Sequence, residues 1–127
     1  MKNILLIFIG GGLGSLARYG VARAFISWSS IFPVGTLTAN ILACLLLGLL
    51  SGWATLSNST NIPDYRAFVA IGFCGGFSTF STFSNETIQL FVSDRWTEAF
   101  LNIFVSLLLC FFATFAGLWL GRQLIVF

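Results

Sequence analysis

The feature that most constrains this chain of 127 residues is a succession of four apolar segments, each long enough to cross a bilayer. A transmembrane helix needs about 20 apolar residues. The four segments are Ile4–Ile26, Val34–Leu56, Tyr65–Val92 and Thr97–Leu124. Only 8% of the residues are charged, against about 25% in soluble domains. The sequence therefore predicts an all-α membrane protein with four transmembrane helices, which form a single domain over residues 1–127.

Positive charges are spread almost evenly over the two sides of the predicted bundle. Lys2, Arg66 and Arg122 fall on one side, and Arg23 and Arg95 on the other. An excess of Lys and Arg normally marks the cytoplasmic side. Three positive residues on one side and two on the other are too nearly equal to identify either side as cytoplasmic. We infer a dual-topology protein that forms an antiparallel homodimer; the alternative is one orientation, set by the insertion machinery. A net charge of +2 without a basic cluster gives no indication of nucleic-acid binding.

Glycines spaced four residues apart occur in three of the spans and predict close helix packing in lipid. The pairs are Gly10 and Gly14, Gly48 and Gly52, and Gly117 and Gly121. The three cysteines lie inside apolar segments of a chain that has no histidine. Neither a disulfide framework nor a zinc site is expected from such a pattern.

Polar residues recur every fourth position in the second and fourth spans, so each set lies on one helix face. They are Thr36, Asn40 and Cys44 in the second span, and Asn102, Ser106, Cys110 and Thr114 in the fourth. Polar groups are costly in hydrocarbon unless they are paired or face water. The two stripes thus indicate either a lined pathway or hydrogen bonds between helices. For Asn40 we favour a functional role, because its amide is expensive to bury.

The third span contains the sequence AIGFCGGFSTFSTFSNET, in which a double glycine precedes a run of serines and threonines. Irregular backbone at membrane depth occurs only where it is buried in protein or lines a watery cavity. The ends of half-helices also present unpaired carbonyl and N–H groups to ions. We therefore expect this helix to be broken at Gly75–Gly76, with ion chemistry at the break.

Phenylalanines follow the double glycine at a spacing of three, at Phe77, Phe80 and Phe83. The edge of an aromatic ring is electropositive, so ring edges facing a pore would favour a small anion. The alternative is that these rings face lipid, as most of the 15 phenylalanines must.

Two charged residues lie deep in the predicted spans. Arg18 can extend to the nearer interface, or it can draw anions into a vestibule. Glu86 can cap backbone donors, pair with an arginine or modify a pathway, and the sequence does not rank these roles.

The segments GGGLGSLARY, GTLTAN and GFCGGFSTFSTFSNE resemble the signature segments of the Fluc/CrcB family of fluoride channels, and the resemblance covers the whole chain. It implies a fluoride-specific channel that gives passive fluoride efflux across the inner (plasma) membrane of bacteria and relieves fluoride toxicity. It also implies a dual-topology homodimer in the lipid bilayer, with two antiparallel pores.

The resemblance further implies roles for individual residues. Phe80 and Phe83 are similar to paired pore phenylalanines, Asn40 to a pore asparagine, and Ser81 and Thr82 to a polar track beside them. We place three residues of the polar stripes on the same pathway, and Arg18 at its vestibule. These three are Thr36, Asn102 and Ser106. By resemblance, backbone carbonyls of Gly75 and Ser78 from both subunits hold a structural sodium ion. Phe77 lies outside the signature and is left out of the pore.

The main alternative function is a small drug/proton antiporter of the four-span, dual-topology type. Such a transporter needs a deep acidic residue, whereas the first span offers Arg18, and Glu86 comes only after the phenylalanine repeat. A non-transporting scaffold would need neither aligned polar stripes nor a broken helix. An enzyme is not expected, because the chain lacks a nucleophile–base pair and a cofactor fingerprint.

Overall fold

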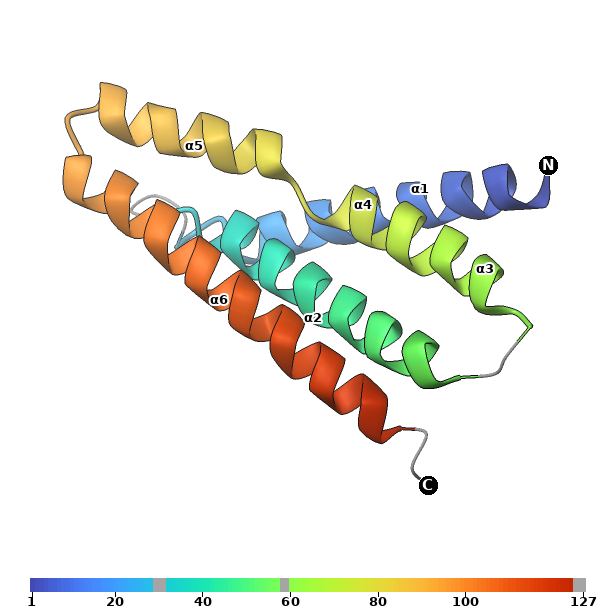
Figure 1. Ribbon diagram of the computed structural model, residues 1–127. Coiled ribbons are helices and arrows are strands. Elements are labelled where there is room, and N and C mark those ends of the chain that lie inside the picture. The colour runs from blue at the N-terminus through green and yellow to red at the C-terminus, as the bar shows by residue number, and fades with distance from the viewer. Residues whose placement is uncertain (29–31, 58–59, 125–127) are drawn as a thin grey trace.

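The computed structural model describes residues 1–28, 32–57 and 60–124, and every regular element among them is helical (Figure 1). The elements are α1 (Lys2–Ala24), α2 (Val34–Leu56), α3 (Ile62–Tyr65), the π-helical segment η1 (Arg66–Cys74), α4 (Gly75–Phe77), α5 (Phe80–Val92) and α6 (Trp96–Gln123). Within the described part of the chain, α1, α2, the run Ile62–Val92 and α6 are long and apolar enough to cross a membrane. The four predicted spans are therefore confirmed; α2 coincides with its prediction, and the third span begins at Ile62 instead of Tyr65.

Two pairs of helices make up most of the bundle: α1 packs along η1 and α4, and α2 packs along α6 (Figure 1). The predicted glycine pairs lie at these contacts. A Cβ atom at Gly48 would collide with the carbonyl oxygen of Thr114, and one at Gly117 with that of Leu45. The same holds at Gly14, where a Cβ atom would meet the carbonyl of Phe73. The predicted close packing of these helices is confirmed.

The start of α1 and the end of α6 lie at the same end of the bundle (Figure 1). An ion pair between Lys2 and Asp64 joins α1 to α3 there. At the opposite end, α5 turns into α6 through Asp94, whose φ of 57° is a left-handed conformation that aspartate tolerates.

Small residues form the centre of the fold, and large apolar residues cover its outside. Ala39, Ala43 and Phe77 form the buried cluster. On α6, by contrast, Phe104, Phe111, Phe112 and Phe115 are each more than 60% exposed. This inside-out distribution suits lipid, which removes the penalty that water would impose on such a surface.

Candidate functional site

The third span is interrupted at Ser78 and Thr79, between α4 and α5. Both residues are extended, with φ −78° and ψ 156° at Ser78 and φ −152° and ψ 113° at Thr79. The predicted break is confirmed, but its predicted position at Gly75–Gly76 is corrected, because both glycines belong to α4. Gly76 instead lets α4 approach α1, since a Cβ atom there would collide with the carbonyl oxygen of Gly11.

Asn40 on α2 holds the interrupted backbone at Thr79. The Thr79 N–H donates to Asn40 Oδ1 at 2.8 Å, and Asn40 Nδ2 donates to the Thr79 carbonyl at 3.4 Å. Thr79 Oγ1 accepts a bond of 3.1 Å from the Thr82 N–H and so caps α5. Side chains thus satisfy backbone groups that a continuous helix would pair internally.

The same bonds deprive two backbone carbonyls of their helical donors. In a continuous α-helix the Thr79 N–H would donate to Gly75 and the Thr82 N–H to Ser78. Here those two N–H groups donate to Asn40 and to the Thr79 hydroxyl instead. Carbonyls at the ends of half-helices and in unwound segments coordinate Na⁺ in membrane proteins, and Gly75 and Ser78 offer one carbonyl of each kind.

Side chains offer no comparable metal site in the part of the chain that the structure describes. No group of three or more His, Cys, Asp or Glu residues there is arranged to hold a metal ion. The Ser78 hydroxyl is already engaged, because it donates to the Cys74 carbonyl at 2.9 Å.

Arg18 on α1 reaches the same break from the other side. Its Nε donates to the Gly76 carbonyl at 3.1 Å. This carbonyl belongs to the last turn of α4, where unpaired carbonyl groups carry partial negative charge. The Arg18 side chain therefore points toward the break, where it contacts the backbone of α4.

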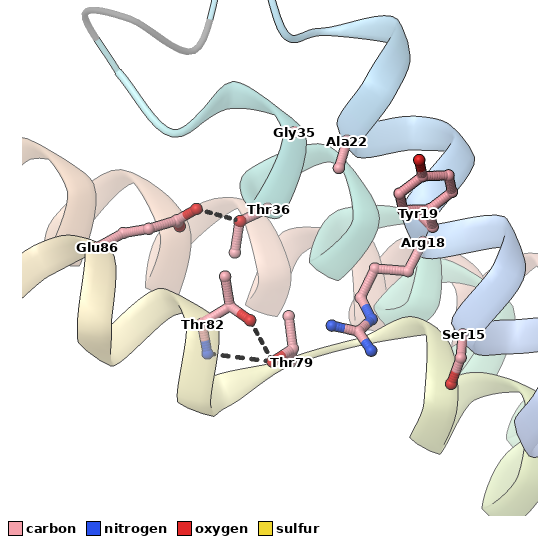
Figure 2. A pocket seen from close by; sticks show the side chains of 9 residues that line it. All are labelled: Ser15, Arg18, Tyr19, Ala22, Gly35, Thr36, Thr79, Thr82 and Glu86. Atoms are coloured by element: carbon pink, nitrogen blue, oxygen red, sulfur yellow. Dashed lines mark hydrogen bonds between the residues drawn. The ribbon is translucent and has the colours of Figure 1, made fainter.

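Arg18 also lines a cavity of about 250 Å³ beside the break (Figure 2). Its polar wall consists of Thr36 on α2 together with Thr79, Thr82 and Glu86 on the α5 side. Ser15 and Tyr19 on α1 add two more hydroxyls, and Ala22 and Gly35 complete the lining. A guanidinium group and five hydroxyls around one cavity can attract and hydrogen-bond a small anion, and the Glu86 carboxylate lies at its edge.

Glu86 lies at the edge of this cavity and borders a second one. Thr36 Oγ1 donates to Glu86 Oε1 at 2.8 Å (Figure 2). The other carboxylate oxygen, Oε2, is buried and has no hydrogen-bond partner among the described residues. On its far side Glu86 lines a cavity of about 220 Å³ together with Gln89, Ser93 and Arg95. Among the described residues its hydrogen-bond partner is the side-chain hydroxyl of Thr36, and the carboxylate lines both cavities.

Phe80 and Phe83 emerge from the first turn of α5 as a pair. Their ring centroids are 5.7 Å apart and the rings are tilted by 42°. Phe80 is 77% exposed in the single chain, whereas Phe77 is 4% exposed and packs on Phe73. The structure thus separates Phe77, a core residue, from the other two rings. Ser81 follows Phe80, and its hydroxyl lies 3.1 Å from that of Thr79.

The polar stripe of α6 has a different environment. Asn102 is 1% exposed and donates to Thr87 Oγ1 at 2.9 Å, and Ser106 Oγ donates to Asn102 Oδ1 at 3.3 Å. Thr87 in turn donates to the carbonyl of Phe83 at 2.7 Å. Asn102 therefore joins α6 to α5, and Ser106 bonds to Asn102 within α6. Neither residue lines the Arg18 cavity, whereas Thr36 and Thr82 do.

Two residues of this site were not singled out from the sequence. Thr79 caps α5, and its signal was the preference of threonine for a position just before a helix, which is useful only once the break has been located. Thr87 joins the α6 stripe to the backbone behind Phe83. Its four-residue spacing from Phe83 is ordinary for a threonine that bonds back to its own helix, so the sequence offered no signal for it.

Comparison with known proteins adds family evidence to this geometry. Residues 5–118 match the family described as CrcB-like protein, Camphor Resistance (CrcB). A protein of Coxiella burnetii (strain Dugway 5J108-111) named "Fluoride-specific ion channel FluC" is 42% identical over 123 residues, which are 96% of this chain and 99% of that protein. A protein of Escherichia coli (strain K12) with the same name is 43% identical over 121 residues, 94% of each chain.

Proposed function

Since this chain belongs to the CrcB-like protein family, we propose that it is a fluoride-specific ion channel through which fluoride leaves the cell passively across the cytoplasmic membrane. The observation that carries the proposal is the break at Ser78 and Thr79. There a discontinuous helix, an inward arginine and a set of hydroxyls meet beside one cavity. Release of fluoride from liposomes that contain the purified protein is the experiment that tests it.

The proposed pathway begins at the cavity that Arg18 and Thr36 line. Fluoride is small and strongly hydrated, so a pore must replace its water with several weak partners, none of which holds it too tightly. The hydroxyls of Ser81 and Thr82, the amide of Asn40 and the ring edges of Phe80 and Phe83 are the groups assigned to this task. Arg18 raises the local anion concentration, and its bond to Gly76 keeps it at the break.

Asn102 and Ser106 are proposed to affect this pathway indirectly, by positioning α5. Their hydrogen bonds run by way of Thr87 to the carbonyl of Phe83. The Asn102–Thr87 bond is the one that crosses from α6 to α5, and it holds α5 one turn after Phe83. Their contribution is therefore proposed to be the position of the ring.

The drug/proton antiporter is a weaker account of the same geometry. A cation exchanger needs a carboxylate whose field is not opposed by a neighbouring cation. Here Arg18 lines the same cavity as Glu86, and positive charge at that site opposes cation entry. The names of the relatives favour the channel as well.

Asn40→Leu is expected to reduce fluoride flux several-fold and to lower the free energy of unfolding by about 2 kcal/mol, because it leaves both backbone groups of Thr79 without their partner. Thr114→Val is the matched control, since the Thr114 hydroxyl bonds only to the Cys110 carbonyl of its own helix, at 2.9 Å. Thermal unfolding and liposome flux of both variants provide the measurement. Equal behaviour of the two variants would show that Asn40 does not hold the break.

The proposed assembly is an antiparallel homodimer with two pores and a structural sodium ion at its centre. Gly75 is exposed, and a Cβ atom there would meet no other atom within 4 Å, so the surface beside it is open to a second chain. Two breaks brought together would offer the Gly75 and Ser78 carbonyls of both subunits. A sodium ion bound by these oxygens would hold the two subunits together and would not itself be transported.

Ser78→Ala is expected to leave both the dimer and the flux close to those of the unchanged protein, since the substitution keeps the carbonyl and removes a hydroxyl that bonds within its own helix turn. Size-exclusion profiles with and without sodium, beside flux measurements, check this. Dissociation of the Ser78→Ala protein would indicate that the hydroxyl itself is a ligand.

A further inference from the structure

A third polar pocket lies near the other end of α2, far along that helix from the Arg18 cavity. Its volume is about 290 Å³, and its polar lining consists of Arg66, Ser51 and Thr55. Arg66 forms no hydrogen bond or ion pair with any described residue, and the nearby carboxylate of Asp64 is paired with Lys2. The pocket therefore presents an uncompensated positive charge.

The depth of this pocket in the membrane follows from its neighbours. Arg66 stands near the start of the third span, directly after Tyr65, whose ring contacts that of Trp53 edge to face with centroids 5.3 Å apart. Tyrosine and tryptophan gather at the level of the lipid headgroups. We therefore expect Arg66 at the depth of the phosphate groups of the bilayer.

The rest of the lining is apolar and consists of Leu47, Leu50, Ala54, Ile62 and Ala70. Leu47, Leu50 and Ala70 form the deeper wall. Leu47 is two turns before Thr55 on α2, and Ala70 is about one turn beyond Arg66, so both lie closer to the bilayer centre than the polar residues. The site thus combines a cationic mouth with an apolar interior, which is the arrangement that a lipid with an anionic headgroup complements.

We propose that this pocket binds an anionic phospholipid, with the phosphodiester on Arg66 and the hydroxyls of Ser51 and Thr55, and the first carbons of an acyl chain against Leu47 and Ala70. Arginine suits this role because its planar donors match phosphate oxygens in pairs. The site shares no residue with the Arg18 cavity, so the inference does not depend on the proposed fluoride pathway.

Arg66→Gln removes the charge while it keeps much of the side-chain length, and Ala70→Leu fills the apolar part. Arg122→Gln is the matched control, because Arg122 is an exposed arginine near the same end of the bundle and lines none of the described cavities. Native mass spectrometry of each protein titrated with phosphatidylglycerol counts the bound lipids. A second arm adds inorganic phosphate to the same samples.

Phosphatidylglycerol binding is expected to weaken roughly tenfold in Arg66→Gln, as for a lost charge-assisted bond, and to fall in Ala70→Leu as well, while Arg122→Gln binds normally and fluoride flux is unchanged. Full lipid binding by Arg66→Gln would overturn the proposal. So would displacement of the lipid by inorganic phosphate, which would identify a site for soluble anions. Loss of the dimer in Arg66→Gln with unchanged lipid binding would show that a second copy of the chain fills the pocket.

Discussion

Replacement of Phe80 or Phe83 by isoleucine is expected to reduce fluoride flux by at least about tenfold while the protein remains folded and dimeric. Isoleucine keeps the apolar character of each side chain but removes the electropositive ring edge that a small anion contacts. In the structure the two rings lie 5.7 Å apart beside a set of hydroxyls, so each is proposed to supply part of the same coordination. Flux from liposomes, read beside a sizing profile, measures the effect.

Phe112 provides the control for this pair. It lies on α6, is 67% exposed and is expected to face lipid or packing partners, so Phe112→Ile should alter flux little. Near-normal flux in both Phe80→Ile and Phe83→Ile would remove the rings from the pathway and leave the hydroxyl groups as its main elements.

A protein forced into a single orientation is expected to lose fluoride flux completely, because an antiparallel dimer needs both orientations. The first design replaces Ser27 and Thr97 with lysine and Arg122 with glutamine. It leaves two positive residues on the side of Lys2, where there were three, and gives four on the side of Arg23, where there were two. The second design replaces Asn3 and Thr60 with lysine, which gives five positive residues on the side of Lys2 and leaves two on the side of Arg23. All five positions are exposed, so folding within each chain should be little affected, whereas the positive-inside rule should fix the orientation.

Coexpression of the two designs should restore flux, since the cell then contains both orientations again. Labelling of an introduced cysteine from one side of the membrane would report the orientation of each design. Flux from either design alone, once its single orientation has been verified, would contradict the antiparallel dimer.

The spans and their close packing were predictable from the sequence because they depend on local properties. Val34–Leu56 has the length and apolarity of a transmembrane helix whatever surrounds it, and glycines four residues apart allow close approach wherever a partner helix lies. Gly48 and Gly117 show this, because a backbone carbonyl of the opposite helix in the α2–α6 pair packs directly against each glycine.

The position of the break depended on partners that the sequence does not reveal. The glycine pair suggested Gly75–Gly76, but a helix ends where other groups satisfy its backbone. Those groups are the amide of Asn40, distant along the chain, and the hydroxyl of Thr79. The role of Gly76 likewise depends on α1, which passes beside it.

The polar stripes were identified correctly as helix faces, whereas their neighbours could not be read from spacing. Thr36 faces Glu86 and the Arg18 cavity, but Asn102 faces Thr87 and is buried. A four-residue repeat gives the side of a helix and not the element that covers it. The same limit applies to Arg18, whose bond to the Gly76 carbonyl could not be read from its position in the first span.

The central claim is fluoride-specific conduction, and ion release from liposomes tests it most directly. Purified protein is reconstituted, a potassium gradient with valinomycin supplies the driving force, and electrodes record fluoride release in one sample and chloride release in a matched one. Rapid fluoride release that requires the protein, with chloride release at the level of protein-free liposomes, is the predicted result. Fluoride release no faster than from protein-free liposomes, or equal release of both anions, would contradict the proposed function.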